Sequence, residues 1–323
     1  MKTKFSQKFS TFVLQNKGNM KITVIGESNL DITVKAHAEA NAKGCVPGSI
    51  AFHYGGVARN IAHNLCLLGH EVKLVSVFGI DDFASRMISD CKQIGMDLSL
   101  SDQFEDAKSP IFLSFNDDTG NMVSAVSDVC LNDRMDLSWL KVKMEVINTS
   151  DIVVADTLLS TEALAYLIDH CKAPLYIDAV SPGKALRFAK AMRIAKKHAV
   201  YALKCNMAEA EQITSEGTAI EASKKLYDNG VYNVYLTLGS SGAICCSEGV
   251  VTTYPALPTA IVNVTGSGDA FFAGVIHAHA NGHYGKDAVA FGLKVAQHNI
   301  KNEAPVNPTL RVDVFSKCFN FRS

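Results

Sequence analysis

Six short apolar runs are spaced along the chain, and each is typical of a strand that is buried on both faces of a sheet. The runs are rich in Val, Ile and Leu, and they lie at residues 21–26, 72–77, 151–156, 173–178, 199–204 and 233–239. Polar or glycine-containing stretches separate them. The pattern therefore predicts a set of central strands.

Helical patterns fill several of the intervals between these runs. Ile61, Leu65 and Leu68 recur at helical spacing, and Gly69 can end that helix. Ser160 can cap another helix that begins directly after it. Strands that alternate with helices predict an α/β fold, with a mostly parallel sheet covered by helices on both faces.

Two segments, at residues 48–56 and 109–126, break this alternation because they are β-like and have no helix within them. The second contains a hairpin signal at 118–121, Asp-Thr-Gly-Asn. We expect these segments to form a small β-sheet lid over a site. The chain shows no linker or internal repeat, so a single domain over residues 20–323 is favoured over two independent ones.

Composition and charge narrow the possible functions. Of 323 residues, 48% are hydrophobic, and the formal net charge is −1, so no overall field favours nucleic acid or an anionic membrane as partner. The nine cysteines include no CxxC pair, which predicts reduced thiols in a cytoplasmic protein. Residues 1–19 carry four lysines and no acid, and we expect a disordered extension there.

The stretch NVTGSGDAFFAG, at residues 263–274, is the first candidate site. A strand-like run at 260–264 precedes it and a helix pattern follows, so Gly266–Gly268 form the turn that enters the helix and Asp269 lies at its N-terminus. Free backbone N–H groups and the helix dipole favour an anion there. A carboxylate beside a phosphate suits a general base for an attacking hydroxyl. An Asp that merely caps the helix would give the same sequence.

Two further loops carry groups that suit a hydroxyl-rich ligand. Asn29 and Asp31 follow the C-terminal end of the first predicted strand, the edge at which open α/β sheets bind ligands. Gly55 and Gly56 form a tight turn before a helix with Asn60 near its start. A polar loop in the first case, and an ordinary turn and cap in the second, are the alternatives.

A second pair of loops suits a nucleotide. Asn206 is a candidate helix N-cap with Glu209 at the capping-box position, and a functional interpretation has Asn206 near phosphate and Glu209 organising water around Mg²⁺. Gly239 and Gly242 flank two serines. The chain has neither GxxxxGK[ST] nor GxGxxG, which argues against a Walker-type or dinucleotide-binding protein.

Together these motifs resemble a known family. GGVARN at 55–60, followed by Gly69 and Gly79, and the stretch at 263–274 are similar to the two signatures of the ribokinase-like (PfkB) carbohydrate kinases. The resemblance covers about residues 20–310. It implies a ribokinase-like three-layer α/β/α fold, ATP- and Mg²⁺-dependent phosphorylation of a sugar or nucleoside hydroxyl, and a homodimer, because lid strands in this family often pair between subunits.

The resemblance also implies roles for individual residues. Asp269 would be the base, and the backbone amides of Gly266, Ser267 and Gly268 would form the anion hole. The sugar would be held by Asn29, Asp31, Gly55, Gly56 and Asn60. The nucleotide side would consist of Asn206, Glu209, Thr237, Gly239 and Gly242, with Glu209 contacting Mg²⁺ through water.

Within the family, the stretches at 55–69, 153–156 and 177–184 resemble the pseudouridine kinase branch, which implies phosphorylation of the 5′-hydroxyl of pseudouridine. Asp156 would then be a further contact to the sugar or base, and Lys184 would reach a base carbonyl or a phosphate. A solvated surface lysine is the alternative for Lys184. Val57 stands where ribokinases usually carry a lysine, which argues against ribose. Asn263 stands where many members carry an Asp that helps to bind a monovalent cation, which weakens the case for K⁺. The alternatives are a kinase for another nucleoside, ribose or a sugar acid, and a non-catalytic nucleoside-binding protein.

Overall fold

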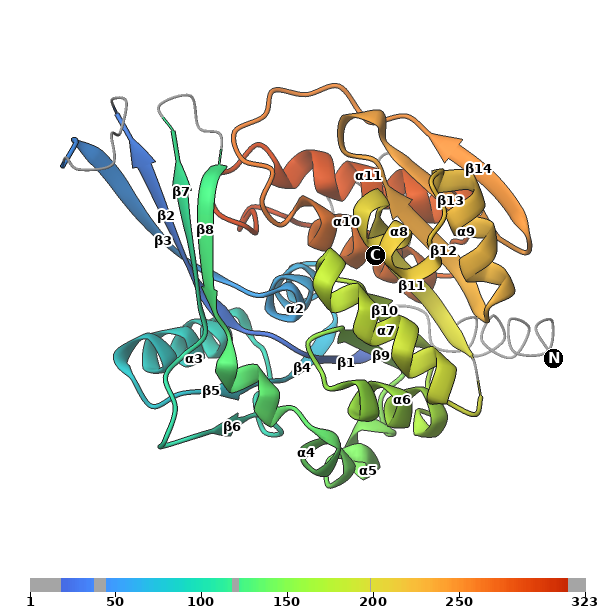
Figure 1. Ribbon diagram of the computed structural model, residues 1–323, viewed down its shortest axis with the longest axis horizontal. Coiled ribbons are helices and arrows are strands. Elements are labelled where there is room, and N and C mark those ends of the chain that lie inside the picture. The colour runs from blue at the N-terminus through green and yellow to red at the C-terminus, as the bar shows by residue number, and fades with distance from the viewer. Residues whose placement is uncertain (1–18, 38–44, 118–121, 198, 313–323) are drawn as a thin grey trace.

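An eight-stranded sheet lies between two layers of helices (Figure 1), in a computed structural model that describes residues 19–37, 45–117, 122–197 and 199–312. The strand order is β14-β13-β12-β11-β10-β9-β1-β4. The bounds are β1 Lys21–Ile25, β4 Glu71–Val75, β9 Ile152–Asp156, β10 Leu175–Asp178, β11 Val200–Asn206, β12 Val231–Thr237, β13 Ala243–Ser247 and β14 Val250–Tyr254. In this order, the strands from β12 through to β4 pair in parallel, whereas β13 pairs antiparallel with both β12 and β14. The predicted three-layer α/β/α fold with a mostly parallel sheet is confirmed.

The helices divide between the two faces of this sheet. One core contains side chains of α2 Val57–Leu67, α3 Asp82–Ile94, α10 Ser267–Ala280 and α11 Lys286–Asn299. The other contains side chains of α4 Leu137–Lys141, α5 Met144–Ile147, α6 Thr161–His170, α7 Pro182–Ile194, α8 Met207–Thr214 and α9 Ala219–Asp228. Short 3-10 helices lie at η1 Cys130–Arg134 and η2 Gly239–Ser241.

Strand β9 shows why the apolar runs are nearly continuous. Ile152 and Val154 are buried in the core below α2 and α10, whereas Val153 and Ala155 are buried in the core on the α6 side. Successive side chains of a strand point to opposite faces, so a strand between two helix layers needs apolar residues at every position.

The predicted helix ends are confirmed at two places. The Ser160 hydroxyl accepts a hydrogen bond from the backbone N–H of Ala163 at the start of α6. Gly69 follows the C-terminal end of α2 with φ at 87°, a left-handed conformation that favours glycine.

A second sheet of four strands projects from one side of the large sheet (Figure 1) and has the order β3-β2-β7-β8. Its strands are β2 Asn29–Ala36, β3 Gly48–Gly55, β7 Ile111–Asn116 and β8 Met122–Asp128. Both segments predicted to be β-like contribute to it, while β2 occupies a stretch for which we expected a loop. A two-stranded sheet joins β5 Val77–Phe78 and β6 Asp102–Gln103.

Two sequence-based expectations on strands are corrected. The hairpin β13–β14 was not predicted, because the preceding loop with Gly239 and Gly242 was interpreted as a nucleotide-binding loop and the strands after it were not considered. The predicted strand at 260–264 is wrong: the segment is irregular, and Val262 and Asn263 both donate their backbone N–H groups to the carbonyl oxygen of Ile300. A β-like run forms a strand only where a neighbouring strand offers a ladder of hydrogen bonds.

The hairpin signal at 118–121 and the expected extension lie outside the described residues, except that Asn19 is described and hydrogen-bonds with Glu71. Along the described part of the chain, no helix has the length and apolar character needed to cross a membrane.

Candidate active site

The polar residues singled out in the sequence meet where the C-terminal ends of β1, β9, β10 and β11 approach the starts of α2 and α10 (Figure 1). This edge is the usual ligand-binding edge of an open α/β sheet. The small sheet supplies the remaining groups through the first residues of β2 and the last residues of β3.

The turn Gly266–Gly268, which we call the anion turn, begins α10 as predicted. Gly266 is the N-cap residue with φ at 75°, and no side chain caps the helix. A Cβ atom on Gly266 would lie 2.0 Å from the carbonyl oxygen of Pro305, so a larger residue does not fit there. The N–H group of Ser267 donates to the carbonyl oxygen of Val264 over 3.1 Å. The other backbone N–H groups of the turn lie at a helix N-terminus, the arrangement that binds anions.

Asp269 lies in the first turn of α10 and is 6% exposed. Its Oδ2 accepts a hydrogen bond of 2.9 Å from Nδ2 of Asn60. Burial and the nearby Asp178 carboxylate raise the pKa of Asp269 to about 7, against the opposing effects of Lys204 and the Asn60 hydrogen bond. A carboxyl group that titrates near neutral pH is well matched to accepting a proton from an alcohol.

The predicted sugar-binding residues cluster at the junction of the small sheet and α2. Nδ2 of Asn29 donates to Oδ1 of Asp31 over 2.7 Å, and a Cβ atom on Gly55 would lie 2.1 Å from Oδ2 of Asp31. Gly56 is the N-cap of α2 with φ at 94°. Burial raises the pKa of Asp31 to about 6. Asn29, Asp31, Gly55, Gly56 and Asn60 are thus brought together.

Asp156 ends β9 in a buried position next to this cluster. Its carboxylate accepts hydrogen bonds from the backbone N–H groups of Glu27, at 2.8 Å, and Leu158, at 2.9 Å. A Cβ atom on Gly26 would lie 2.2 Å from that carboxylate. Asp156 therefore fixes the loop after β1, and its predicted contact with a sugar or base stays a prediction.

Sequence reasoning missed Glu27, which lies between Asp156 and the small sheet. Its Oε1 accepts a hydrogen bond of 2.8 Å from Nδ2 of Asn132. Burial and Asp156 together raise the pKa of Glu27 to about 8, while the charge of Lys184 acts in the opposite direction. Lys184, in the first turn of α7, is thus close to the cluster. An acidic residue directly after an apolar strand was the available signal for Glu27.

Sequence reasoning also missed an ion pair between Lys204 on β11 and Asp178 on β10. The distance from Nζ to Oδ2 is 3.1 Å, and the two side chains are 8% and 0% exposed. A Cβ atom on Gly268 would lie 2.9 Å from Nζ of Lys204, so the pair lies directly beneath the anion turn. A lysine at the end of an otherwise apolar run was the signal in the sequence.

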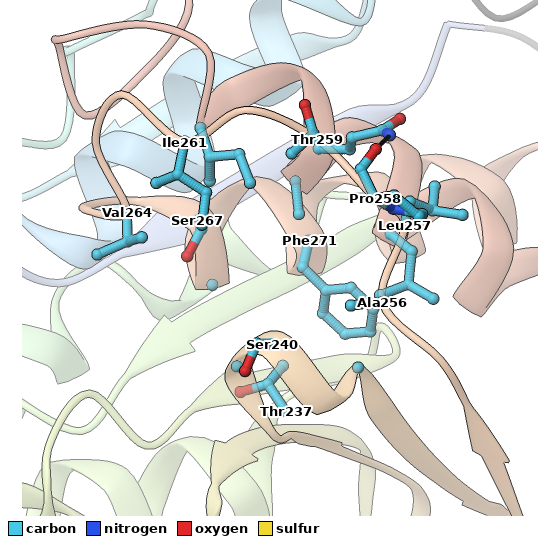
Figure 2. A pocket seen from close by; sticks show the side chains of 17 residues that line it. Thr237, Ser240, Ala256, Leu257, Pro258, Thr259, Ile261, Val264, Ser267 and Phe271 are labelled. Carbon is cyan, nitrogen blue, oxygen red and sulfur yellow. Dashed lines mark hydrogen bonds between the residues drawn. The ribbon is translucent and has the colours of Figure 1, made fainter.

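A cavity of ≈ 450 Å³ borders the anion turn and is lined by none of the predicted sugar-binding residues (Figure 2). Figure 2 shows Thr237 and Ser240 facing Ser267 and Phe271 across it. Of the predicted nucleotide-side residues, Thr237, Gly239 and Gly242 line the cavity, as do Ser267 and Gly268 of the turn. Apolar residues supply much of the remaining wall: Ala256, Leu257, Pro258, Ile261, Val264, Phe271, Leu293, Ala296 and Ile300.

Asn206 and Glu209 do not line this cavity. They form the predicted capping box of α8, in which Asn206 Oδ1 accepts from the N–H of Glu209 and the Glu209 carboxylate accepts from Asn206. Burial raises the pKa of Glu209. Asn206 pairs with Thr237 in the β11–β12 register, which keeps the box next to the cavity wall.

The arrangement fits a nucleotide with Mg²⁺. The cavity volume lies within the range of sites for small ligands, and the glycines leave room for a phosphate chain to approach the backbone. Each carboxylate oxygen of Glu209 accepts one hydrogen bond from Asn206 and keeps a second lone pair. A water ligand of Mg²⁺ could therefore donate to Glu209 without breaking the capping box. The side-chain amide of Asn263 is occupied by local contacts: its Nδ2 donates to the carbonyl oxygen of Glu303, and its Oδ1 accepts from the backbone N–H of Thr265.

Comparison with known proteins agrees with this geometry. Residues 19–311 match the model of the pfkB family carbohydrate kinases. The chain is 29% identical to pseudouridine kinase of Escherichia coli (strain K12), covering 90% of this chain and 94% of the relative, and 25% identical to guanosine-inosine kinase of Exiguobacterium acetylicum, covering 85% and 93%. A solved carbohydrate kinase from Agrobacterium tumefaciens superposes with a TM-score of 0.79 and 26% identity, covering 92% of this chain and 96% of that one.

The match extends over nearly all described residues, from the first strand to the segment after α11. It includes the anion turn, Asp269 and the glycine turn before α2. The chain therefore belongs to the pfkB family of carbohydrate kinases, phosphotransferases that use ATP and act on an alcohol group.

Proposed function

We propose that the protein is an ATP-dependent kinase that phosphorylates the 5′-hydroxyl of pseudouridine. The Asp269 carboxylate, held by Asn60 and directly next to the uncapped anion turn, carries the proposal, because it places a base beside an anion site. The choice of substrate is supported by the 29% identity to a pseudouridine kinase and by Val57 in place of the lysine that is usual in ribokinases.

Asp269 would accept the proton of the 5′-hydroxyl as the hydroxyl oxygen attacks the γ-phosphorus of ATP. The new bond forms between that oxygen and phosphorus, the bond to the bridging oxygen breaks, and ADP leaves with the electron pair. Asn29, Asp31, Gly55, Gly56 and Asn60 would orient the ribose, with Asp156 and Lys184 nearer the base. The N–H groups of Gly266, Ser267 and Gly268 would stabilise the charge on the transferring group.

Mg²⁺ would supply further charge neutralisation when bound with ATP, with Glu209 positioning its water ligands. Thr237, Gly239 and Gly242 would contact the nucleotide. K⁺ activation is the weaker expectation because Asn263 is uncharged and its amide is engaged locally. We further propose a cytoplasmic location and a kinase domain over residues 20–323, with a lid formed by about 48–56 and 109–126, preceded by the extension 1–19.

Turnover with ATP on a panel of pseudouridine, uridine, guanosine, inosine, ribose and a sugar acid tests the substrate. We expect the highest kcat/KM with pseudouridine and a product phosphorylated at the 5′ position, identified by ³¹P NMR. Turnover of ribose with none of pseudouridine would reject this substrate while leaving the family unchanged.

A kinase for another nucleoside is the second candidate, favoured by the 25% identity to a guanosine-inosine kinase. The same panel separates the two, since purine nucleosides would then give the higher kcat/KM.

We also propose a homodimer formed through the small sheet. Val34 pairs with Ile50, and Ile32 pairs with both Phe52 and Leu113, so these side chains share one face. Ile50 is 61% exposed and Phe52 is 57% exposed. Asp31 is on the opposite face, which turns toward the site, so the apolar face is free for a second copy of the chain.

A further inference from the structure

The buried pair of Lys204 and Asp178 lies on the face of the large sheet that α10 covers. Strands β10 and β11 are parallel neighbours, and Asp178 is the register partner of Lys204. Partners across a ladder project to the same face. Tyr176, two residues before Asp178, packs in the same core as Phe271 of α10, which identifies that face.

The ammonium group of Lys204 reaches the backbone of the anion turn. A Cβ atom on Gly268 would lie 2.9 Å from Nζ and 3.1 Å from Cε of Lys204. Gly268 does not have a left-handed φ, so its backbone conformation does not require glycine. The missing side chain instead makes room for the lysine directly under the turn.

A cation at this place is unfavourable unless anions are near it, because a helix N-terminus already carries partial positive charge. Burial by itself would lower the pKa of Lys204, but the carboxylates of Asp178, Glu209 and Asp269 outweigh that effect and raise the pKa. The group therefore stays charged at neutral pH. Positive charge from the uncapped turn and from the ammonium group converges at the start of α10.

The segment that holds Asp178 is also strained. Val180 has φ at 64°, a conformation that β-branched residues rarely adopt, and its backbone N–H donates to Oδ1 of Asp178 over 2.9 Å. Strain of this kind is concentrated at functional sites. Asp178 thus anchors both the loop before α7 and the ammonium group of Lys204.

We propose that Lys204 is a positioning residue for phosphoryl transfer: its ammonium group supports the anion turn and places fixed positive charge beneath the phosphates of the nucleotide. Asp178 holds the group in place, and its negative charge partly offsets the positive charge of the ammonium group. The role assigned to Lys204 rests on the proposed kinase reaction, but it does not depend on which alcohol is the acceptor.

Calorimetric titration with the β,γ-imido analogue of ATP and, separately, with adenosine tests this role in the presence of Mg²⁺ and without any acceptor. Lys204→Met, which keeps the length of the side chain, should weaken binding of the triphosphate by about tenfold or more. Binding of adenosine should stay within about twofold, since adenosine has no phosphate. Lys204→Arg should restore most of the affinity for the triphosphate.

Lys143→Met is the matched control, because Lys143 is another buried lysine paired with an aspartate, Asp102, over 2.6 Å and away from the site. We expect Lys143→Met to lower stability and to leave both affinities unchanged. Equal losses for triphosphate and adenosine in Lys204→Met, or no loss for either, would show that the Lys204 pair is only structural.

Asp178→Asn gives an independent test that does not require Lys204→Met to fold. The amide oxygen can still accept from Val180 and from the ammonium group of Lys204, which both donate to Oδ1 of Asp178, so Lys204 stays in place while the negative charge that offsets it is removed. We expect triphosphate binding at least as tight as that of the wild type. Weaker triphosphate binding in Asp178→Asn would overturn the proposal. Since no acceptor is present, these outcomes are separate from the identity of the nucleoside substrate.

Discussion

Asn60 and Asp269 are 209 positions apart in the sequence, and the side chain of one donates a hydrogen bond of 2.9 Å to the carboxylate of the other. The bond joins the start of α2 to the start of α10. It connects the two sequence signatures of the family at a carboxylate in the first turn of α10, directly after the anion turn.

Asn60→Ala removes a donor that lowers the pKa of Asp269, so the pKa of that carboxyl should rise further above about 7. We expect the acidic limb of kcat/KM against pH to move upward by up to about one unit. Asn64→Ala is the control: Asn64 is buried on the same helix but donates to the carbonyl of Asn60. If the midpoint of the acidic limb is the same in Asn60→Ala as in the wild type, the hydrogen bond from Asn60 does not act on the pKa of Asp269.

Asp269→Asn should lower kcat by a factor on the order of 10² or more, because the amide cannot accept the proton of the attacking hydroxyl. Affinity for ATP should change little, since the anion turn is intact. Steady-state kinetics with both substrates measure this. Asp82→Asn, at an exposed Asp in the first turn of α3, should leave kcat unchanged. Full activity in Asp269→Asn would exclude it as the base.

Glu27→Gln should make thermal stability less dependent on pH. The pKa of Glu27 is raised from 4.5 to about 8 in the folded protein, so its contribution to stability is complete below pH 4.5 and is lost as the pH rises through about 8. The wild type should therefore lose several degrees of Tm between pH 5 and pH 9, by the usual scaling of Tm with free energy.

Glutamine is neutral at every pH and can still accept from Asn132. The difference in Tm between wild type and Glu27→Gln should thus grow in favour of the variant as the pH rises. Parallel Tm curves for the two proteins would be inconsistent with a buried, protonated Glu27.

Gly266→Ala should destabilise the protein far more than Gly95→Ala. Both glycines have left-handed φ angles, which cost an alanine roughly 1 kcal/mol, but only Gly266 has a carbonyl oxygen, that of Pro305, at 2.0 Å from a Cβ atom. Gly95 has open space around that position. Urea unfolding measures both costs, and the KM for ATP should rise only in Gly266→Ala. If both variants lose the same free energy of unfolding, the anion turn can shift away from Pro305 without cost, and the close contact does not fix it.

Phe52→Asp should convert the proposed homodimer into a monomer, because it places a charge in the centre of the apolar face of the small sheet. Val250→Asp is the control, as Val250 is 65% exposed on β14 at the far edge of the large sheet. Light scattering after size exclusion measures the mass of each. A wild-type protein that is already monomeric at micromolar concentration would refute the dimer.

Local patterns in the sequence were sufficient for much of the fold. Apolar runs located the parallel strands because a strand between two helix layers must be apolar throughout. Cap residues such as Ser160 and Asn206 marked helix starts because their hydrogen bonds reach only three residues along the chain. The glycine turn before Asp269 was equally local.

What the sequence by itself determined, then, were the elements and the loops that carry chemistry. The tertiary structure alone decided which loops meet. It brought Asn60 to Asp269, buried Glu27, and placed Lys204 beside Asp178 through the order and register of β10 and β11. It also left residues 260–264 without a strand partner. The reason is physical: hydrogen-bond partners across a sheet and the burial that shifts a pKa depend on chain segments far apart in sequence, which no local pattern encodes.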